Sequence, residues 1–363
     1  MTTQRKLTFH VVQHLTPGGI EILAINMTKL ASPEHKVLII SLEGQLQQAI
    51  DAWPVLAEIQ DKLLFLDKGP GVEVKTWRTL YRLFRIMQPD LVHTHHIGPL
   101  LYASVAARLA GVKHRIHTEH DAWHLENSKS RWVQGAALSF AKPWLVADAQ
   151  HVKGVIDDHF GYSRSTVIHN GIDCTRFKPA AKPLARQALG LPTDKRLIGC
   201  AGRLENVKGH DVAIRALATL PSHYHLVIAG RGSERESLIA LARELGVESR
   251  LTLLGLIEDT ARFYPCLDVF VQPSRFEGFP LATLEAQACG IATVATDVGG
   301  TADTLCPQSS LLIEPDNVTA LSEAILALER RTLPHSPRPF VERQFEIREM
   351  IKAYQMLTKE ACA

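Results

Sequence analysis

The chain has 363 residues, of which 46% are hydrophobic and 21% are charged, and its formal net charge is +2. This length exceeds that of an ordinary single core, so we expect two domains of about 150–200 residues. The ordinary composition excludes a fibrous or disordered chain, and the near-neutral charge gives no argument for nucleic acid as a partner.

In the first half, short apolar runs alternate with helical patterns. Strands are predicted over 6–12, 35–42, 62–66, 90–95, 114–118 and 144–148. Helices are predicted between them, for example over 20–30, 74–87, 99–109 and 152–159. Continuous apolar strands separated by amphipathic helices indicate a parallel sheet that is covered on both faces.

The second half repeats this pattern. Its strands are predicted over 196–202, 224–230, 250–255, 268–274, 291–296 and 310–315. The fold class is therefore α/β, with two Rossmann-like, doubly wound domains. We expect the first domain over 1–175 and the second over 176–340, with a last helical segment over 341–363 that returns to the first domain.

The cysteines and the first residues bear on the compartment. No CxxC pair occurs among Cys174, Cys200, Cys266, Cys289, Cys306 and Cys362. This favours reduced thiols. We see neither a signal peptide nor a run of about 18 apolar residues. The expected location is the cytoplasm, with peripheral contact at the inner face of the plasma membrane left open.

Ligands of open α/β sheets bind beyond the carboxyl ends of the strands. After the first strand, Gly18 and Gly19 open a helix whose N–H groups suit an anion, although a tight turn needs glycine as well. After the first strand of the second half, GRLENVKGHD carries Arg203 and Lys208, two cations that suit a diphosphate. The alternative for this second stretch is a solvated charged loop.

The stretch SRFEGFPLATLEAQACG (274–290) places one acid on each side of a bend. Glycine and proline form the bend, so the N–H groups of 279–282 point towards whatever Glu277 faces. Glu285 lies one turn into the following helix and faces the same cleft. A carboxylate in that position commonly accepts two vicinal hydroxyls, as on a ribose. With a further turn at Gly299–Gly300, these features predict a cleft for a phosphorylated ligand.

The histidines allow a second interpretation. They gather near two strand ends, at His93, His95, His96, His114, His117, His120 and His124. Imidazoles are common metal ligands. The spacing nevertheless fits strands and loops better than a preformed ligand set, so we expect hydrogen-bonded cleft or core residues and no metal site.

Two segments are candidates for contact with an anionic membrane. The helix KTWRTLYRLFRIM (75–87) is basic and aromatic, and 128–144 is a second candidate. The alternative for 75–87 is an ordinary helix that buries Trp77, Leu80 and Phe84 and exposes its arginines.

Several motifs together carry a resemblance. GGIE, HTEHD, VIHNGID, GRLENVKG and the E-x7-E block resemble the retaining glycosyltransferases of family 4, which have the GT-B fold. The resemblance implies two facing Rossmann-like domains, with the nucleotide-sugar donor on the second and the acceptor on the first. It also implies catalysis without a metal or another cofactor. A nicotinamide enzyme is disfavoured, because G-x-G-x-x-G is absent.

The resemblance implies a role for each matching residue. Arg203 and Lys208 hold the diphosphate and stabilise the leaving group, Glu285 binds the ribose, and Glu277 contacts the transferred sugar. His120 lies near the reacting sugar. The remaining donor-binding residues are Gly18, Gly19, Ile257, Gly278, Phe279, Pro280 and Leu281.

The implied activity is transfer of a hexose from a nucleotide sugar, for which UDP is our choice of nucleotide. The acceptor is a hydroxyl of a cell-surface glycan or a lipid-linked molecule, as in polysaccharide or lipopolysaccharide biosynthesis. Two alternatives stay open: a nucleotide-sugar 2-epimerase on the same fold, and a binder of nucleotide sugars without catalysis.

Overall fold

The computed structural model describes residues 6–257, 259–330 and 336–360. The chain divides after Asn170, and the residues from Arg348 onward belong with the first unit, so unit 2 comprises Gly171–Ile347. The sequence placed these boundaries at 175 and 340. They differ because Ile172 bridges to Glu346, which fixes the residues after Asn170 to the end of unit 2.

Unit 1 is built on a parallel sheet with the strand order β3-β2-β1-β4-β5-β6-β7. The strands are β1 (Lys6–Val12), β2 (His35–Ser41), β3 (Leu63–Phe65), β4 (Leu91–His95), β5 (His114–Glu119), β6 (Trp144–Ala147) and β7 (Ser165–Val167). The sequence does not predict β7, since its three half-buried residues give no apolar run. The order reverses between β1 and β4, which is where ligands bind in doubly wound sheets.

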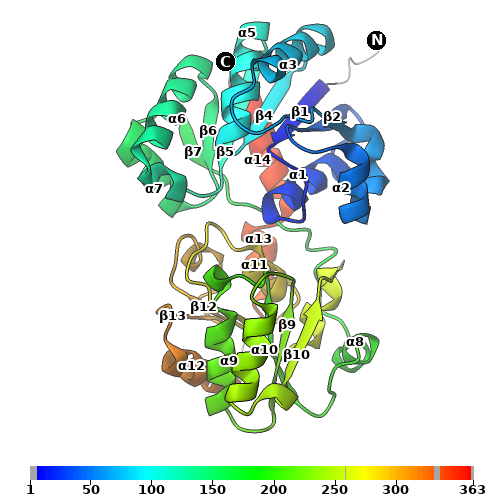
Figure 1. Ribbon diagram of the computed structural model, residues 1–363, viewed down its shortest axis with the longest axis vertical. Coiled ribbons are helices and arrows are strands. Elements are labelled where there is room, and N and C mark those ends of the chain that lie inside the picture. Colours follow the sequence, from blue (N-terminus) through cyan, green and yellow to red (C-terminus); the bar gives the residue numbers. More distant parts are fainter. Residues whose placement is uncertain (1–5, 258, 331–335, 361–363) are drawn as a thin grey trace. The chain divides into compact units, whose positions relative to one another are not determined.

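Helices cover both faces of this sheet (Figure 1). They are α1 (Gly19–Lys29), α2 (Leu46–Ala52), η1 (Pro54–Lys62), α3 (Val74–Met87), α4 (Ile97–Pro99), η2 (Leu100–Ser104), α5 (Val105–Ala110), η3 (Trp123–Glu126), α6 (Ser128–Ala141), α7 (Gln150–Phe160) and α14 (Ile347–Glu360). Successive strand residues point to opposite faces, so Phe9 and Val11 pack with Phe84 of α3, whereas Val12 packs with Ile25 of α1. The helix predicted over 99–109 is present in three pieces, with a π-helical turn in the middle.

The sequence predicts one helical segment over 341–363, but the structure has two helices in this part of the chain. Residues Phe345 and Glu346 interrupt it, separating α13 (Arg338–Gln344) of unit 2 from α14. In unit 1, α14 lies beside the sheet (Figure 1). Its residues Met350, Tyr354 and Leu357 are buried at helical spacing.

Unit 2 repeats the architecture, with the strand order β10-β9-β8-β11-β12-β13, all parallel. The strands are β8 (Arg196–Ala201), β9 (Tyr224–Ala229), β10 (Leu251–Gly255), β11 (Val269–Gln272), β12 (Thr293–Thr296) and β13 (Leu311–Ile313). The other elements are α8 (Lys182–Ala188), η4 (Asn206–Lys208), α9 (His210–Thr219), α10 (Arg235–Glu244), η5 (Glu248–Arg250), η6 (Thr260–Arg262), η7 (Tyr264–Cys266), α11 (Leu281–Ala288), η8 (Ala302–Thr304), α12 (Val318–Arg330) and α13. The strand order now reverses between β8 and β11.

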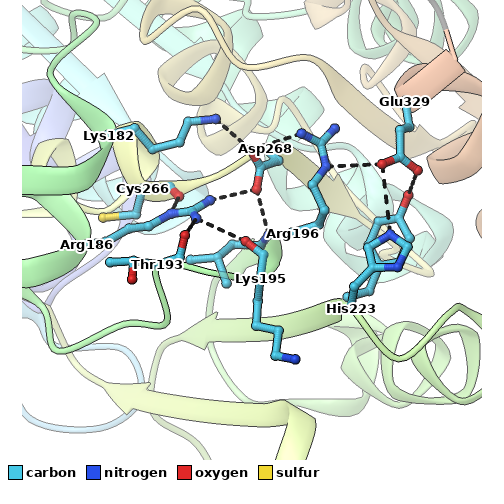
Figure 2. A network of polar contacts seen from close by, with 11 residues as sticks. Lys182, Arg186, Thr193, Lys195, Arg196, His223, Cys266, Asp268 and Glu329 are labelled. Atoms are coloured by element: carbon cyan, nitrogen blue, oxygen red, sulfur yellow. Dashed lines mark hydrogen bonds and ion pairs between the residues drawn. The ribbon is translucent and has the colours of Figure 1, made fainter.

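A largely buried carboxylate, 10% exposed, fixes α8 to the start of this sheet (Figure 2). Asp268 precedes β11 and accepts hydrogen bonds from Lys182 Nζ at 2.7 Å, Arg186 at 2.6 Å and the N–H of Leu197 at 2.7 Å. Burial alone raises the pKa of a carboxyl group, but these donors hold the pKa of Asp268 below its ordinary value. Arg186 is itself buried and also donates to the carbonyl of Cys266. Removing the carboxylate charge therefore leaves a buried guanidinium without its counter-ion.

We expect the Asp268→Asn substitution to lower the free energy of unfolding of unit 2 by about 3 kcal/mol, as for other buried ion pairs that lose one partner. Urea unfolding followed by circular dichroism measures the loss. The control is Glu248→Gln, which removes a fully exposed partner of Arg243 and leaves the transition midpoint unchanged. Equal midpoints for both variants contradict the role assigned to Asp268.

Candidate functional site

The predicted donor residues of unit 2 lie in loops at the carboxyl end of its sheet. Arg203 and Lys208 follow β8, Glu277 and the bend follow β11, and Ile257 follows β10. The first two loops flank the point where the strand order reverses. This is the position at which doubly wound sheets bind their ligands.

Glu277 is the centre of these loops. Its side chain is 8% exposed, and its Oε1 accepts hydrogen bonds from Lys208 Nζ at 2.7 Å, Gln272 Nε2 at 2.6 Å and Ser274 Oγ at 2.6 Å. Among the residues that the structure describes, none bonds to Oε2. The carboxylate is thus fixed through one oxygen and offers the other to a ligand.

Sequence reasoning missed Gln272 and Ser274. Both belong to the stretch VQPSRFE, in which the last strand residue and the loop carry polar side chains just before Glu277. That cluster of hydrogen-bonding groups at a strand end was the available signal.

Close backbone contacts hold the loops around Glu277 together. A Cβ atom at Gly299, whose φ is +55°, would lie 1.8 Å from the carbonyl oxygen of Glu277. A Cβ at Gly209, with φ +64°, would lie 1.9 Å from the carbonyl oxygen of Pro273. Only glycine combines such a φ with such an approach. The guanidinium of Arg275 adds ion pairs to Asp211 and Asp316.

The remaining residues of the bend are placed as follows. Gly278 accepts a hydrogen bond at its carbonyl from the N–H of Gly300 at 2.8 Å. Phe279 is buried and its ring lies 6.0 Å from that of Phe345. Pro280 is the N-cap of α11, and Leu281 is its first residue. The E-x7-E stretch therefore forms the bend into a helix that its glycine and proline predict.

Arg203 and Ile257 lie in the loops after β8 and β10. Arg203 is exposed, and its guanidinium forms no ion pair with another described residue; its carbonyl accepts a hydrogen bond from His210 Nε2 at 3.2 Å. Ile257 is half-buried directly after β10. An unpaired guanidinium at the switch point leaves a full positive charge for an anionic ligand.

Glu285 lies in α11 and is half-buried. Its Oε2 accepts a hydrogen bond from the hydroxyl of Tyr264 at 2.5 Å. Burial raises the pKa of Glu285 to about 7, although the Tyr264 hydroxyl and the charge of Arg176 act in the opposite direction. This carboxyl group therefore changes its charge near neutral pH.

In unit 1, Gly18 is the N-cap of α1 and Gly19 is its first residue. The carboxylate of Glu21 occupies this turn: a Cβ at Gly18 would lie 2.3 Å from Glu21 Oε2. Glu21 is buried, which raises its pKa, and its Oε1 lies 3.5 Å from His14 Nδ1. An anion bound at this helix end would therefore lie close to the carboxyl group of Glu21, a contact that the sequence did not predict.

His120 belongs to a buried chain of hydrogen bonds that runs from Asp148 to His10. Its Nδ1 donates to Asp148 Oδ2 at 3.3 Å, and Asn170 Nδ2 donates to the same oxygen at 2.8 Å. His120 Nε2 lies 3.1 Å from His95 Nδ1, and His95 Nε2 lies 3.2 Å from His10 Nδ1. A carboxylate only accepts, so it sets the direction: His10 donates to His95, and His95 donates to His120.

The structure also brings together three histidines that the sequence analysis did not group. One ring nitrogen each of His10, His93 and His95 lies within 4.8 Å of the other two. His93 bonds to Thr118 at 2.7 Å, and its ring lies against that of His95, with centroids 4.2 Å apart. Hydrogen bonds engage His10 with His95 and His93 with Thr118, whereas His93 Nδ1 is buried without a partner among the described residues. By contrast, His114 starts β5 and lies at the opposite, amino end of the sheet.

The two membrane candidates differ in structure. Helix α3 buries Leu80 and Phe84, and Trp77 donates its indole N–H to the carbonyl of Leu101 at 2.8 Å, as in an ordinary amphipathic helix. Helix α6 instead exposes Trp132 by 75% and Phe140 by 49%. Within the described residues, no helix is both long enough and apolar enough to span a bilayer.

The fold with its two sheets is shared with known structures. HepE of Anabaena, crystallised with UDP and glucose, superposes with a TM-score of 0.85 at 19% identity, covering 98% of this chain and 100% of that one. A glycosyltransferase from Rickettsia africae ESF-5 gives 0.80 at 20% identity and 99% coverage of both chains. The fold is therefore that of the GT-B glycosyltransferases, with two Rossmann-like units.

Sequence comparison gives the family. Residues 17–176 match the family Glycosyltransferase Family 4, and residues 181–343 match the family Glycosyl transferases group 1. Over 145 residues the chain is 39% identical to D-inositol 3-phosphate glycosyltransferase of Mycobacterium tuberculosis H37Rv. That match spans 38% of this chain and only 30% of the length of the relative. The chain belongs to the family 4 glycosyltransferases.

Proposed function

We propose that the protein transfers a hexose from a nucleotide sugar to an acceptor hydroxyl, and that unit 2 binds the donor. The observation that carries this proposal is the Glu277 carboxylate, which Lys208, Gln272 and Ser274 hold through one oxygen at the switch point of the sheet. A diphosphate sugar needs cations for the phosphates and oxygen acceptors for the sugar hydroxyls. The loops after β8 and β11 supply both.

Each residue has a distinct part in this proposal. Glu277 Oε2 accepts sugar hydroxyls, and its charge stabilises positive charge that develops at the anomeric carbon. Lys208 and Arg203 stabilise the departing diphosphate, and Glu285 accepts the ribose hydroxyls. We propose retention of configuration: the acceptor hydroxyl attacks on the face that the diphosphate leaves, and the diphosphate takes its proton.

The proposal also names the nucleotide of the donor and the class of acceptor. UDP is the proposed nucleotide, and the crystallisation of HepE, which shares this fold, with UDP and with UDP-glucose supports that choice. The proposed acceptor is a glycan or a lipid-linked molecule. The partial match to a D-inositol 3-phosphate glycosyltransferase adds inositol phosphate as an acceptor to test. No metal is proposed for catalysis, since Lys208 and Arg203 carry the required positive charge.

The test is turnover with UDP-glucose, D-inositol 3-phosphate and a panel of glycan acceptors, in the presence of EDTA. Release of UDP and the mass of the new glycoside are measured. Glu277→Gln keeps the size of the side chain but removes its charge, so we expect turnover to fall by about 100-fold or more. UDP affinity should change little, and the exposed Glu248→Gln variant serves as the control.

Three outcomes contradict parts of this proposal. Full turnover by Glu277→Gln removes the role of the carboxylate, and loss of wild-type turnover in EDTA removes the metal-independent mechanism. Conversion of the donor to its 2-epimer without an acceptor identifies an epimerase instead.

Glu285 predicts a pH dependence of nucleotide binding. With a pKa of about 7, it is ionised above that pH and then accepts two ribose hydroxyls. Binding therefore lowers its pKa, and UDP affinity should fall as the pH drops below 7, by up to about tenfold per unit. Calorimetry from pH 6 to 8.5 measures the slope. In Glu285→Gln this part of the slope disappears, while titration of the UDP phosphate remains; identical slopes in both proteins contradict the assignment.

We also propose peripheral contact with an anionic membrane, now through α6, since Trp132 and Phe140 are exposed there. Co-sedimentation with phosphatidylglycerol vesicles tests it. Double substitution of both aromatic residues by serine should abolish pelleting, whereas Tyr81→Ser on α3 should not. Wild-type protein that stays in the supernatant overturns the proposal.

A further inference from the structure

His96 has an unusual backbone conformation. It follows β4 directly, with φ +69° and ψ 162°. This region of conformational space is accessible almost only to glycine, because a Cβ atom collides with the backbone there. Other non-glycine residues with positive φ, such as Gln88 and Lys142, lie in the ordinary left-handed region instead, with ψ of 57° and 52°. A histidine at position 96 is therefore strained.

The position of His96 in the sheet corresponds to that of the donor loop in unit 2. In unit 1 the strand order reverses between β1 and β4, and His96 is the first residue beyond β4. In unit 2 the reversal lies between β8 and β11, and the loop after β11 carries Glu277. The carboxyl ends of these two strands are the positions at which such sheets contact their ligands.

The imidazole of His96 is the accessible ring of its cluster. His93 and His95 are buried, and His120 is 5% exposed with both ring nitrogens engaged inside unit 1. The His96 ring is half-buried, lies 6.1 Å from the His120 ring, and makes no hydrogen bond to any residue that the structure describes.

The surroundings keep this ring neutral. Burial lowers the pKa of His96 to about 4, together with the charge of His120, while the acids Asp121 and Glu119 act in the opposite direction and His14 adds to the lowering. A neutral imidazole has one donor and one acceptor nitrogen. That pair matches a hydroxyl group, which also donates and accepts.

We propose that His96 contacts a hydroxyl of a sugar or polyol bound at the switch point of unit 1. The inference rests on the proposed glycosyl transfer and adds a substrate-contacting residue to it. The strained backbone is retained because the imidazole is required there: glycine would satisfy the turn without strain, but it would remove the ring. The hydroxyl belongs either to the acceptor or to the transferred sugar.

The variant His96→Gly tests the proposal, because it removes strain and side chain together. We expect a higher melting temperature than in the wild type and at least about a tenfold loss of turnover, the factor that corresponds to one hydrogen bond to a substrate. His96→Asn tolerates positive φ and keeps a donor and an acceptor, so part of the activity should return. The matched control is Gln88→Gly, which removes a positive-φ side chain at the amino end of β4 and leaves turnover unchanged.

Two assays distinguish the sources of the hydroxyl. Turnover of UDP-glucose with D-inositol 3-phosphate and the glycan panel gives the acceptor KM, and a rise in that KM assigns His96 to the acceptor. Hydrolysis of UDP-glucose without an acceptor reports on the transferred sugar, and a slower rate assigns His96 to it.

Wild-type kinetics of His96→Gly in both assays overturn the inference and leave the proposed function intact. A lower melting temperature of that variant overturns the strain on which the inference depends. Wild-type protein that leaves every nucleotide sugar intact contradicts the proposed function, and with it this inference.

Discussion

The position of one carboxylate depends on three donors, two from its own strand end and one from the loop after β8. Glu277 is buried, and an unpaired buried carboxylate is unfavourable, so its contacts with Lys208, Gln272 and Ser274 determine how the loops after β8 and β11 meet. The same contacts keep a lysine and a glutamate side by side at the switch point. Glycines at 209 and 299 allow the backbone to come close enough. Donor recognition and loop packing therefore depend on the same few atoms.

In unit 1, the buried polar side chains of the sheet include neutral imidazoles, such as that of His10. Its sheet carries histidines on the face covered by α14, where charged imidazoles would be costly, and burial lowers the pKa of His10 to about 4. Hydrogen bonds link the rings of His10, His95 and His120 and end at Asp148, whereas His93 Nδ1 has no partner among the described residues. The result is a buried, polar interior that reaches His120, whose ring lies 6.1 Å from that of His96. The side chains of His120 and His96 therefore lie next to a core that is polar and hydrogen-bonded.

Apolar runs made the sheets predictable, because buried parallel strands are continuous in hydrophobicity. Short or half-buried elements such as β7 give no such signal, and the break at Phe345 depends on a bridge from Glu346 to Ile172, far away in the sequence. The partners Gln272 and Ser274 stand close to Glu277 in the sequence and could have been found there. Its contact with Lys208, 69 residues away, could not. His10 joined the histidine cluster only through the register of β1 with β4, which places it opposite His93. Backbone strain at His96 leaves no trace in composition or periodicity.

The course of the chain through α14 has a consequence for how the protein is made. Strands β1 to β7 leave the ribosome first, but the helix that supplies Tyr354 to His93 and Thr118 is synthesised only after all of unit 2. Until then, the histidine face of the sheet lacks the helix that covers it in the folded protein. The residues of unit 2, which end at Ile347, all precede this helix along the chain. During translation the residues of unit 2 are thus complete before the first unit receives its last helix.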